Sequence, residues 1–410
     1  MMTNRLKHIV KFPFHLMIYM ISRMCEWVHR DNSIWAFGCH TGFGDNAKFF
    51  FFEVNEHHQE IRAIWIAHRY KDVKKIRTLG YESYFWLSGK GLYYSLIAGV
   101  YVYTRVPVDI NRFFSGGAFL LTLNHGVGLK KLYWTNEFHL QKEYGKSIAE
   151  LENSFYFKVL TYIGLFRTPD LCLVTSRDQK ENFYTKQFRI PMSFCIGCKT
   201  PRIKMFFKSD EEIICMARRY EPVETESLIN RLSQYKKIYI YMPTWRNDNS
   251  DFIESSMIDF EELNDIMKQQ NMLFILKLHP YTKINIKNIS QYSNILNYNN
   301  RIDIYYILPY TDCLITDYSS IYTDYLTMNK EVILFTFDKK RYLERCVELE
   351  NYDNYYKGVE ISTFGELLSI IKSNKDCHLS ESDYLCVMDL FWSYIDIPVD
   401  IVEEVKKRLN

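Results

Sequence analysis

Short apolar runs alternate with longer segments of helical periodicity along the chain after Asp31. In the first half, the compact apolar runs predict strands and the amphipathic stretches between them predict helices. The predicted strands are Ser33–Phe37, Ile61–Ala67, Val100–Tyr103 and Gly117–Leu123, and the clearest helices are Asn46–Asn55 and Lys90–Ala98. This alternation indicates an α/β fold.

The second half repeats the same rhythm. Its predicted strands are Lys237–Met242, Leu273–Leu278, Cys313–Thr316 and Val332–Thr336, and helical patterns cover Phe260–Gln270 and Ile321–Met328. Two consecutive α/β domains are therefore expected, with their boundary between Arg189 and Tyr235. We place the domains at residues 31–195 and 196–380, followed by a C-terminal helical segment at 381–410.

Residues 1–30 form a basic segment rich in apolar and aromatic side chains. The uninterrupted apolar run Leu16–Ile21 is far shorter than the roughly 20 residues that a membrane-spanning helix needs. No cleavage site of small residues follows it, so the pattern does not favour a signal peptide. Two interpretations stay open: an amphipathic helix lying in a membrane interface, or a first helix packed on its own domain.

Composition narrows the classes of function. The 410 residues are 47% hydrophobic and 16% aromatic, which allows two substantial cores. A net charge of +2, from 51 basic and 49 acidic residues, argues against nucleic acid as a partner bound through bulk charge. The ten cysteines form no regular framework, which favours a reducing compartment and a cytoplasmic protein.

Polar residues follow several predicted strands at the point where each strand ends. Ligands of open α/β sheets bind outside these carboxyl ends, so the residues there are candidates for chemistry. In the second domain they are Thr244, Arg246, His279, Asp317, Ser319 and Ser320, and in the first domain they are His125, Gly126 and Lys130.

Each of these candidates also has a structural interpretation. Asp317 to Ser320 precede a helix and predict either an anion site or ordinary helix capping. Arg246 is either a surface arginine or a paired donor to phosphate, and His279 is either a core histidine or a phosphate donor. His125 is either a turn residue or a general base. The sequence contains no Walker A loop, no GxGxxG motif and no metal-ligand spacing.

The motifs, taken in order, resemble the CDP-glycerol glycerophosphotransferase family. The resemblance rests first on PTWR at 243–246, KLHP at 277–280 and LITDYSS at 314–320 followed by Asp324. Further matches are GFGDN at 42–46, which contains Asn46, HGVGLK at 125–130, SRDQKENF at 176–183 and the Pro201–Arg202 pair. Together they extend along nearly all of the chain after Asp31.

The resemblance implies two doubly wound Rossmann-like domains facing a cleft, as in glycosyltransferases of the B type. The first domain would serve the acceptor and the second would bind the nucleotide donor. The implied reaction transfers glycerol phosphate or another polyol phosphate from CDP-glycerol or CDP-ribitol to a hydroxyl of a polymer or lipid-linked primer, releasing CMP. Such enzymes build teichoic acids and related capsule polymers, so we expect a peripheral protein on the inner face of the cytoplasmic membrane.

The resemblance also implies roles for particular residues. His125 would remove the acceptor proton, while Arg246, His279, Ser319 and Ser320 would hold the donor pyrophosphate. Asp317 would orient the turn, and Lys130 would assist near the transferred phosphoryl group. Thr244 joins the donor site, and the further candidates are Asn46, Gly126, Lys277, Asp324 and Arg202. Mg²⁺ could assist without a dedicated ligand set.

Two other classes of function stay open at this point. A nucleotide-sugar glycosyltransferase of the same fold, including one that uses a CMP-sugar for capsule or lipopolysaccharide synthesis, could use the same anion-binding residues. A non-catalytic scaffold of the capsule machinery would tolerate loss of the site, yet this chain keeps both His125 and His279 and the pair of serines.

Overall fold

The computed structural model describes residues 4–131, 147–163, 167–246, 255–278, 289–345 and 352–409. The chain divides into two compact units. The first unit contains Met1–His125, Lys131–Arg202 and Ser393–Asn410, and the second contains Gly126–Lys130 and Ile203–Trp392. The chain enters the larger part of the second unit after Arg202, whereas the sequence predicted a boundary at 195/196.

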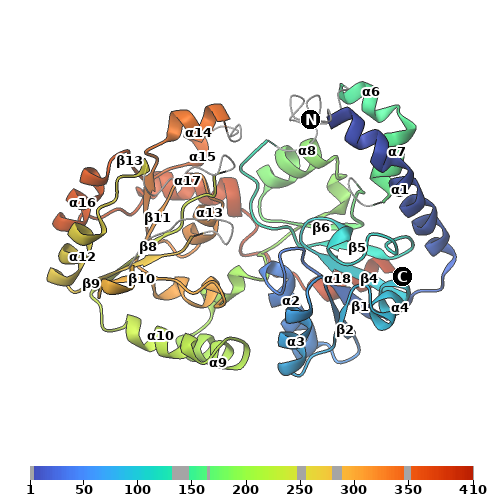
Figure 1. Ribbon diagram of the computed structural model, residues 1–410, viewed down its shortest axis with the longest axis horizontal. Helices are drawn as coiled ribbons and strands as arrows, with labels where there is room; N and C mark the ends of the chain where they lie inside the picture. Colours follow the sequence, from blue (N-terminus) through green and yellow to red (C-terminus); the bar gives the residue numbers. More distant parts are fainter. Residues whose placement is uncertain are drawn as a thin grey trace. The chain divides into compact units, whose positions relative to one another are not determined.

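The first unit is built on a sheet of seven parallel strands in the order β3-β2-β1-β4-β5-β6-β7 (Figure 1). The strands are β1 Asp31–Phe37, β2 Arg62–Ala67, β3 Ser83–Phe85, β4 Ala98–Tyr103, β5 Phe119–Thr122, β6 Leu171–Val174 and β7 Cys195–Gly197. The helices are α1 Asn4–Met24, α2 Asp45–His57, α3 Tyr70–Thr78, α4 Gly89–Ile97, α6 Ile148–Glu152, α7 Phe155–Tyr162, α8 Lys186–Phe188 and α18 Ile401–Leu409.

The second unit has a sheet of six parallel strands in the order β10-β9-β8-β11-β12-β13. The strands are β8 Lys237–Tyr241, β9 Met272–Leu276, β10 Ile295–Asn297, β11 Cys313–Thr316, β12 Glu331–Phe335 and β13 Val359–Ile361. The helices are α9 Asp210–Tyr220, α10 Glu224–Leu232, α12 Phe260–Gln269, α13 Ile321–Leu326, α14 Lys339–Arg345, α15 Tyr352–Tyr355, α16 Phe364–Ser373 and α17 Glu381–Trp392.

Both sheets are covered on their two faces, which explains why their strands are continuous apolar runs. Cys313 and Ile315 of β11 belong to a core formed with α12 and α16. Leu314 lies between them, points to the other face and is also fully buried. The predicted doubly wound α/β architecture is confirmed in each unit.

The predicted elements are found, but several are shorter than predicted, and one strand and one helix show the physical reason. The strand predicted at Gly117–Leu123 begins only at Phe119, because Gly117 has a φ of 77° and belongs to a turn. The helix predicted at Ile321–Met328 ends at Leu326 and is followed by Asn329 with a φ of 50°. The C-terminal helical segment is shared, since α17 lies in the second unit and α18 in the first.

In each sheet, the strand order reverses direction at a single place. The first strand of each unit, β1 or β8, pairs on one side with the second strand and on the other with the fourth, β4 or β11. In doubly wound folds, this topological switch point is where the loops after neighbouring strands separate and leave a crevice for ligands. The two switch points therefore locate the candidate sites.

The N-terminal segment forms the long helix α1, which packs on α7. Ile18 is buried there against Val159, Leu160 and Ile163. No helix in the described part of the chain is both long and apolar enough to cross a membrane.

Candidate functional site

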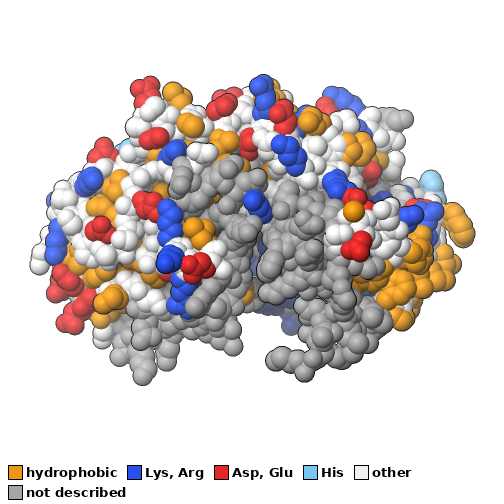
Figure 2. Space-filling model, turned by 90° about the horizontal axis from the view of Figure 1, so that it is seen from above, with side chains coloured by type: hydrophobic (Ala, Val, Ile, Leu, Met, Phe, Trp, Pro, Cys, Tyr) orange, Lys and Arg blue, Asp and Glu red, His pale blue; other side chains and the backbone are white. Residues whose placement is uncertain are grey.

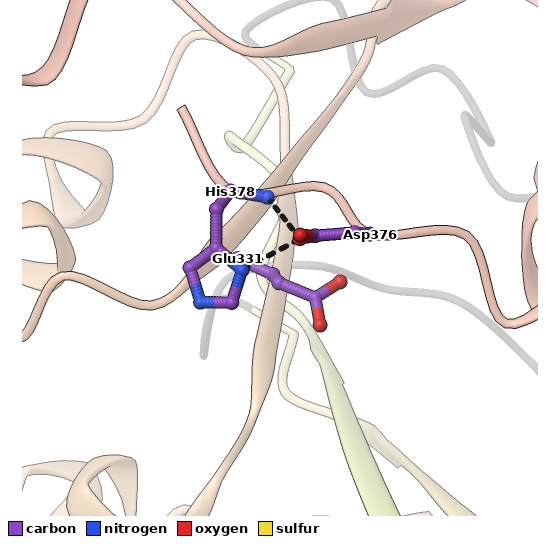
Figure 3. Close-up of side chains that lie close together, drawn as sticks. All are labelled: Glu331, Asp376 and His378. Atoms are coloured by element: carbon purple, nitrogen blue, oxygen red, sulfur yellow. Dashed lines mark hydrogen bonds and ion pairs between the residues drawn. The ribbon is translucent and has the colours of Figure 1, made fainter. Parts of the chain in front are cut away.

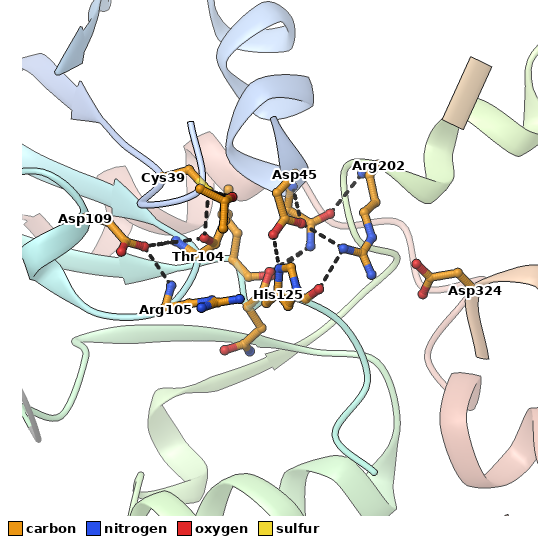
Figure 4. A network of polar contacts seen from close by, with 12 residues as sticks. Cys39, Asp45, Thr104, Arg105, Asp109, His125, Arg202 and Asp324 are labelled. Atoms are coloured by element: carbon orange, nitrogen blue, oxygen red, sulfur yellow. Dashed lines mark hydrogen bonds and ion pairs between the residues drawn. The ribbon is translucent and has the colours of Figure 1, made fainter. Parts of the chain in front are cut away.

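His125 and Asp45 form the centre of a polar cluster at the carboxyl edge of the first sheet (Figure 4). His125 follows β5, and Asp45 begins α2 after the glycine-rich loop that leaves β1. Nδ1 of His125 contacts Oδ2 of Asp45, and Arg202 Nη1 donates to Oδ1 of the same carboxylate at 2.7 Å. One carboxylate thus contacts both the imidazole and the guanidinium.

Arg202 and Asn46 fix the backbone around this pair. Arg202 Nη1 also donates to the carbonyl oxygen of His125 at 2.6 Å, and the Arg202 N–H donates to Asn46 Oδ1 at 3.0 Å. Asn46 Nδ2 in turn donates to the carbonyl oxygen of Asn124 at 2.8 Å. Asn46 and Arg202 are both buried. We call Asp45, Asn46, His125 and Arg202 the His125 cluster.

The electrostatics of the cluster keep the carboxylate of Asp45 ionised beside the imidazole. Burial alone would raise the pKa of Asp45, but the charges of His125 and Arg202 outweigh it and hold that pKa well below its usual range. The side chain of Asp45 is only 6% exposed, whereas that of His125 is 51% exposed. Because Nδ1 faces the carboxylate, the neutral ring carries its hydrogen there and keeps a lone pair on Nε2.

The structure brings together three residues that the sequence motifs named separately, His125, Asn46 and Arg202. It adds Asp45, which the sequence reasoning did not select. The signal was present as the acid of the GFGDN motif, directly before Asn46. Gly126 follows the histidine with a φ of 147°, a conformation that a side chain would strain.

A second cluster lies at the switch point of the second sheet. Arg246 follows β8 and is only 2% exposed. Its Nη2 donates to Asp317 Oδ2 at 2.8 Å and to Asp338 Oδ1 at 2.9 Å, and its Nε donates to Asp338 Oδ2 at 2.8 Å. The Thr244 N–H donates to Asp317 Oδ1 at 2.8 Å, and its carbonyl accepts from Arg246 Nη1 at 2.6 Å. We call Thr244, Arg246, Asp317 and Asp338 the Arg246 cluster.

This geometry gives Arg246 a structural role beside the one expected from the sequence. The sequence suggested a guanidinium that binds the donor pyrophosphate, but the side chain is enclosed and its donors are directed at two carboxylates and a carbonyl. Asp338, which the sequence reasoning did not select, completes that enclosure. Arg246 and Asp317 therefore hold the loops after β8 and β11 together.

Ser319 and Ser320 are half-buried and precede α13. Ser320 occupies the N-cap position, yet its side chain makes no capping hydrogen bond. Ser319 Oγ accepts from the Ile321 N–H at 3.5 Å, which is a long contact. Helix capping, the structural alternative, thus accounts poorly for these two hydroxyls. The hydroxyl of Thr244 is buried and has no hydrogen-bond partner among the described residues.

The remaining candidates fall into different surroundings. Lys130 Nζ donates to the Tyr342 hydroxyl at 3.0 Å. Burial lowers the pKa of Lys277, beside the end of β9, to about 8. Asp324 is buried and accepts from the Tyr305 hydroxyl at 2.5 Å, so it supports the fold of the second unit. His279 lies outside the described residues.

One group of potential metal ligands occurs among the described residues, formed by Glu331, Asp376 and His378 (Figure 3). Glu331 begins β12, so the group lies at the amino edge of the second sheet, away from the strand ends that carry the candidates. Lys237 Nζ lies 2.6 Å from Glu331 Oε1, and this ammonium already neutralises the carboxylate. We therefore assign no metal to the group.

Comparison with known proteins adds independent findings. The sequence matches the family described as CDP-glycerol:poly(glycerophosphate) glycerophosphotransferase over residues 17–399. It is 26% identical to the teichoic acid poly(ribitol-phosphate) polymerase of Bacillus spizizenii over 206 residues, which cover 50% of this chain and 32% of the relative. It is 35% identical to the teichoic acid glycerol-phosphate primase of Bacillus subtilis over 183 residues, covering 44% and 43%. The chain thus spans less than half the length of these two relatives.

The fold is shared with the solved wall teichoic acid polymerase TagF. The two structures align with a TM-score of 0.71 over 99% of this chain and 98% of the other, at 18% identity. This likeness confirms the expected fold class, the glycosyltransferase B type.

Proposed function

Because the chain belongs to the CDP-glycerol:poly(glycerophosphate) glycerophosphotransferase family, we propose that it transfers a polyol phosphate from a CDP-polyol to a growing polymer or lipid-linked primer. CDP-glycerol and CDP-ribitol are the donors to test first, since the two relatives above are named for glycerol phosphate and ribitol phosphate. The observation that carries the proposal is the exposed imidazole of His125, held by the buried carboxylate of Asp45.

In the proposed reaction, an acceptor hydroxyl attacks the phosphorus that carries the polyol. A new P–O bond to the acceptor forms as the P–O bond to CMP breaks, so the products are a phosphodiester and free CMP. His125 Nε2 takes the proton of the attacking hydroxyl, and the Asp45 carboxylate stabilises the imidazolium that forms. Phosphoryl transfer depends mainly on alignment and charge neutralisation, so no covalent enzyme intermediate is needed.

The second unit supplies the donor site in this proposal. Ser319, Ser320 and Thr244 offer hydroxyls to the pyrophosphate, and Lys277 and Lys130 offer positive charge. Thr244, Lys277, Ser319 and Ser320 lie at strand ends of the second sheet, and Lys130 belongs to the segment Gly126–Lys130 of the same unit, which supports this assignment. Arg246 and Asp317 act as positioning residues for the loops that carry those hydroxyls. His279 stays a candidate for the pyrophosphate on its sequence motif alone.

A donor panel tests the proposal directly. The purified protein is incubated with a lipid-linked or oligomeric acceptor and with CDP-glycerol, CDP-ribitol, a CMP-sugar or a UDP-sugar, and nucleotide release is followed. We expect acceptor-dependent release of CMP with a CDP-polyol only. Turnover of a nucleotide sugar in place of both CDP-polyols would identify a glycosyltransferase and overturn the proposal. Absence of turnover with every donor, while binding is retained, would favour the scaffold interpretation.

We further propose that α1 holds the protein at an anionic membrane surface on the cytoplasmic side, where lipid-linked acceptors are made. Phe14, Met17, Met20, Met24 and Trp27 recur every three or four residues and are 45 to 86% exposed. Figure 2 shows hydrophobic side chains gathered at the right-hand end, where α1 lies in Figure 1. Such an apolar face, beside the basic residues Lys11 and Arg23, suits an anionic bilayer interface.

Co-sedimentation with vesicles tests the role of α1. We expect the protein to pellet with phosphatidylglycerol vesicles more than with phosphatidylcholine vesicles, and the M20S/W27S variant to pellet less than wild type. Leu385→Ser is the control, because Leu385 is also exposed, at 60%, but belongs to α17, which is far from α1 in the sequence. Equal losses in both variants would contradict the proposal.

A further inference from the structure

A group of basic and aromatic side chains lies at the carboxyl edge of the first sheet and takes no part in the His125 cluster. His40 follows β1, His68 follows β2, Trp86 follows β3 and Arg112 follows β4. The ring of His68 lies 6.1 Å from that of His40 and 5.0 Å from that of Trp86, and the Arg112 guanidinium lies 5.7 Å from the Trp86 ring. We call these four residues the basic–aromatic cluster.

The cluster occupies the switch point of the first sheet and the strands next to it. Thr104, after β4, donates from its hydroxyl to Cys39 Sγ at 3.4 Å, which ties the loop after β4 to the loop after β1. Gly38 allows this approach, because a Cβ there would come within 2.5 Å of the Asp109 carbonyl oxygen. The polar contacts of this loop pair appear at the left of Figure 4.

The loop after β4 also contacts His68 of the cluster. His68 Nε2 lies 3.0 Å from the Asp109 carbonyl oxygen, and the buried Asp109 carboxylate accepts from the Arg105 N–H at 3.0 Å. These bonds fix the position of His68 and, through it, the face of Trp86. The side chains of His40 and Arg105 are exposed at the same edge.

The charges in the cluster are not neutralised locally. Nε of Arg112 is buried and has no hydrogen-bond partner, and its guanidinium forms no ion pair within the described ranges. Burial, together with the nearby charges of His40 and Arg112, lowers the pKa of His68. Asp109 is the acidic residue closest to Arg112 in the sequence, and its carboxylate accepts hydrogen bonds from the backbone amides of residues 104 and 105. The exposed imidazole of His40 and the guanidinium of Arg112 lie in the same cluster as the indole ring of Trp86. Such a group suits a small anion attached to an apolar or polyol segment.

We propose that the basic–aromatic cluster binds a phosphate group of the anionic acceptor, with the adjoining polyol or sugar beside Trp86. This inference rests on the proposed function and adds the acceptor's phosphodiester as a recognised group. His125 follows β5 at the same edge of the same sheet, two strands from β1. Strand spacing puts the strand ends before His40 and His125 about 10 Å apart, and those before Trp86 and His125 about 19 Å apart. An acceptor chain bound to the cluster can therefore run along the edge that carries the proposed base.

Binding of acceptor without donor is the primary test. The affinity of the full-length protein for an oligomer of glycerol phosphate is measured by calorimetry, with a neutral polyglycerol of the same length as the uncharged probe. We expect Arg112→Gln to weaken oligomer binding about tenfold, since it removes a charge-assisted hydrogen-bond donor to the phosphate. His40→Gln should weaken it less, and salt should weaken wild-type binding more than binding by Arg112→Gln.

Arg77→Gln is the matched control. Arg77 belongs to the same unit and lies over an aromatic ring, with its guanidinium 5.3 Å from the ring of Tyr84, but it is at the end of α3. Its replacement should leave oligomer binding unchanged. Equal binding by wild type, Arg112→Gln and Arg77→Gln would overturn the inference, as would equally tight binding of neutral polyglycerol.

Kinetics separate this inference from the proposed function. In a transfer assay, Arg112→Gln should raise the acceptor KM and leave the CDP-glycerol KM unchanged; the opposite pattern would assign the cluster to the donor and overturn the inference. If the wild type turns over no CDP-polyol but Arg112→Gln still loses oligomer binding, the proposed function fails while the phosphate site stands. If Arg112→Gln loses binding to phosphatidylglycerol vesicles and keeps oligomer binding, the bound phosphate is a lipid headgroup and the acceptor assignment is wrong.

Discussion

The His125 cluster and the Arg246 cluster each contain an ion pair between an arginine and an aspartate, but the two pairs have different consequences. Each places an arginine against an aspartate at the carboxyl edge of a parallel sheet, at 2.7 Å in one and 2.8 Å in the other. In the first, the pair supports a histidine whose side chain is 51% exposed. In the second, a further carboxylate, Asp338, encloses the arginine completely. An arginine at a strand end is therefore evidence of a site only when the pair leaves a reactive group exposed.

Replacing His125 should produce the largest effect on activity. His125→Ala is expected to reduce kcat about 1,000-fold, because a general base typically contributes between 10² and 10⁴. Stability should change little, since the side chain is half exposed. Steady-state kinetics with CDP-glycerol and thermal unfolding measure the two quantities.

His57→Ala is the control for that experiment, because His57 is exposed at the end of α2 in the same unit. It should keep near-normal kcat. Near-normal kcat in His125→Ala would remove the exposed imidazole from the mechanism, and the contrast between the two clusters would lose its functional meaning.

The Arg246 cluster should respond through stability. Arg246→Met leaves Asp317 buried without its cation and is expected to lower the free energy of unfolding by about 3 kcal/mol. Arg218→Met is the matched control, because Arg218 is 67% exposed in its pair with Glu226, and its loss should leave stability nearly unchanged. Urea denaturation measures both.

Arg246→Met can also give a result that contradicts this contrast between the two clusters. If Arg246→Met is as stable as wild type but binds CDP-glycerol much more weakly, Arg246 contacts the donor directly. The role expected from the sequence motif would then be right, and the enclosure by Asp317 and Asp338 would have to open in the bound state.

Asp45→Asn should have an intermediate effect. Asparagine tolerates the φ of 62° at this position and keeps a hydrogen-bond acceptor, but it removes the charge that faces His125 and Arg202. We expect kcat to fall, up to about 100-fold for a misplaced base, with little change in the donor KM. Unchanged kcat would show that the imidazole needs no carboxylate.

The pH dependence of stability offers a second readout for Asp45. Its pKa is depressed in the folded protein, so its stabilising contribution is present above the unfolded pKa of about 3.9 and is lost as the pH falls further. The difference in unfolding free energy between wild type and Asp45→Asn should therefore narrow below about pH 4. Asp72→Asn, which breaks a pair with Arg69 on α3, serves as the control for kcat and should leave it unchanged.

The sequence predicted the fold well because the signal is local. Buried parallel strands are short apolar runs, and β11 was predicted with the same bounds, Cys313–Thr316, that the structure has. The edge strands β3, β7, β10 and β13 have three residues each, too few to show a period, and they were not predicted. Local patterns also located His125, Asn46 and Arg202, because each lies within a recognisable motif.

The sequence did not predict contacts between residues that are far apart along the chain. Asp45 is 80 residues from His125, and Asp338 is 92 residues from Arg246. Contacts over such separations cannot be inferred from a single sequence. The sequence therefore did not show that Asp45 contacts His125 or that Asp338 pairs with Arg246. The burial of an arginine side chain indicates whether it can contact a ligand or instead supports the structure. For a loop residue such as Arg246, that burial depends on the packed fold and cannot be inferred from the sequence.

Lys277 provides the smallest and most discriminating prediction, because it is a half-buried cation that forms no carboxylate pair within the described ranges. Its Nζ donates to the Leu278 carbonyl oxygen at 3.2 Å, and burial lowers its pKa to about 8, partly offset by the charge of Asp303. A lysine pKa below the unfolded value of about 10.4 means that protonation disfavours the folded state. The cost is full below about pH 8 and disappears above about pH 10.

Lys277→Met should therefore raise the free energy of unfolding by about 1 kcal/mol at neutral pH, with no gain near pH 10. Lys237→Met is the matched control, because Lys237 is buried but paired with Glu331 at 2.6 Å, and its loss should destabilise the protein. If Lys277 binds the donor, Lys277→Met will combine higher stability with a higher CDP-glycerol KM. A stabilised variant with an unchanged KM would remove Lys277 from the donor site, and a destabilised one would show that its charge is paired after all.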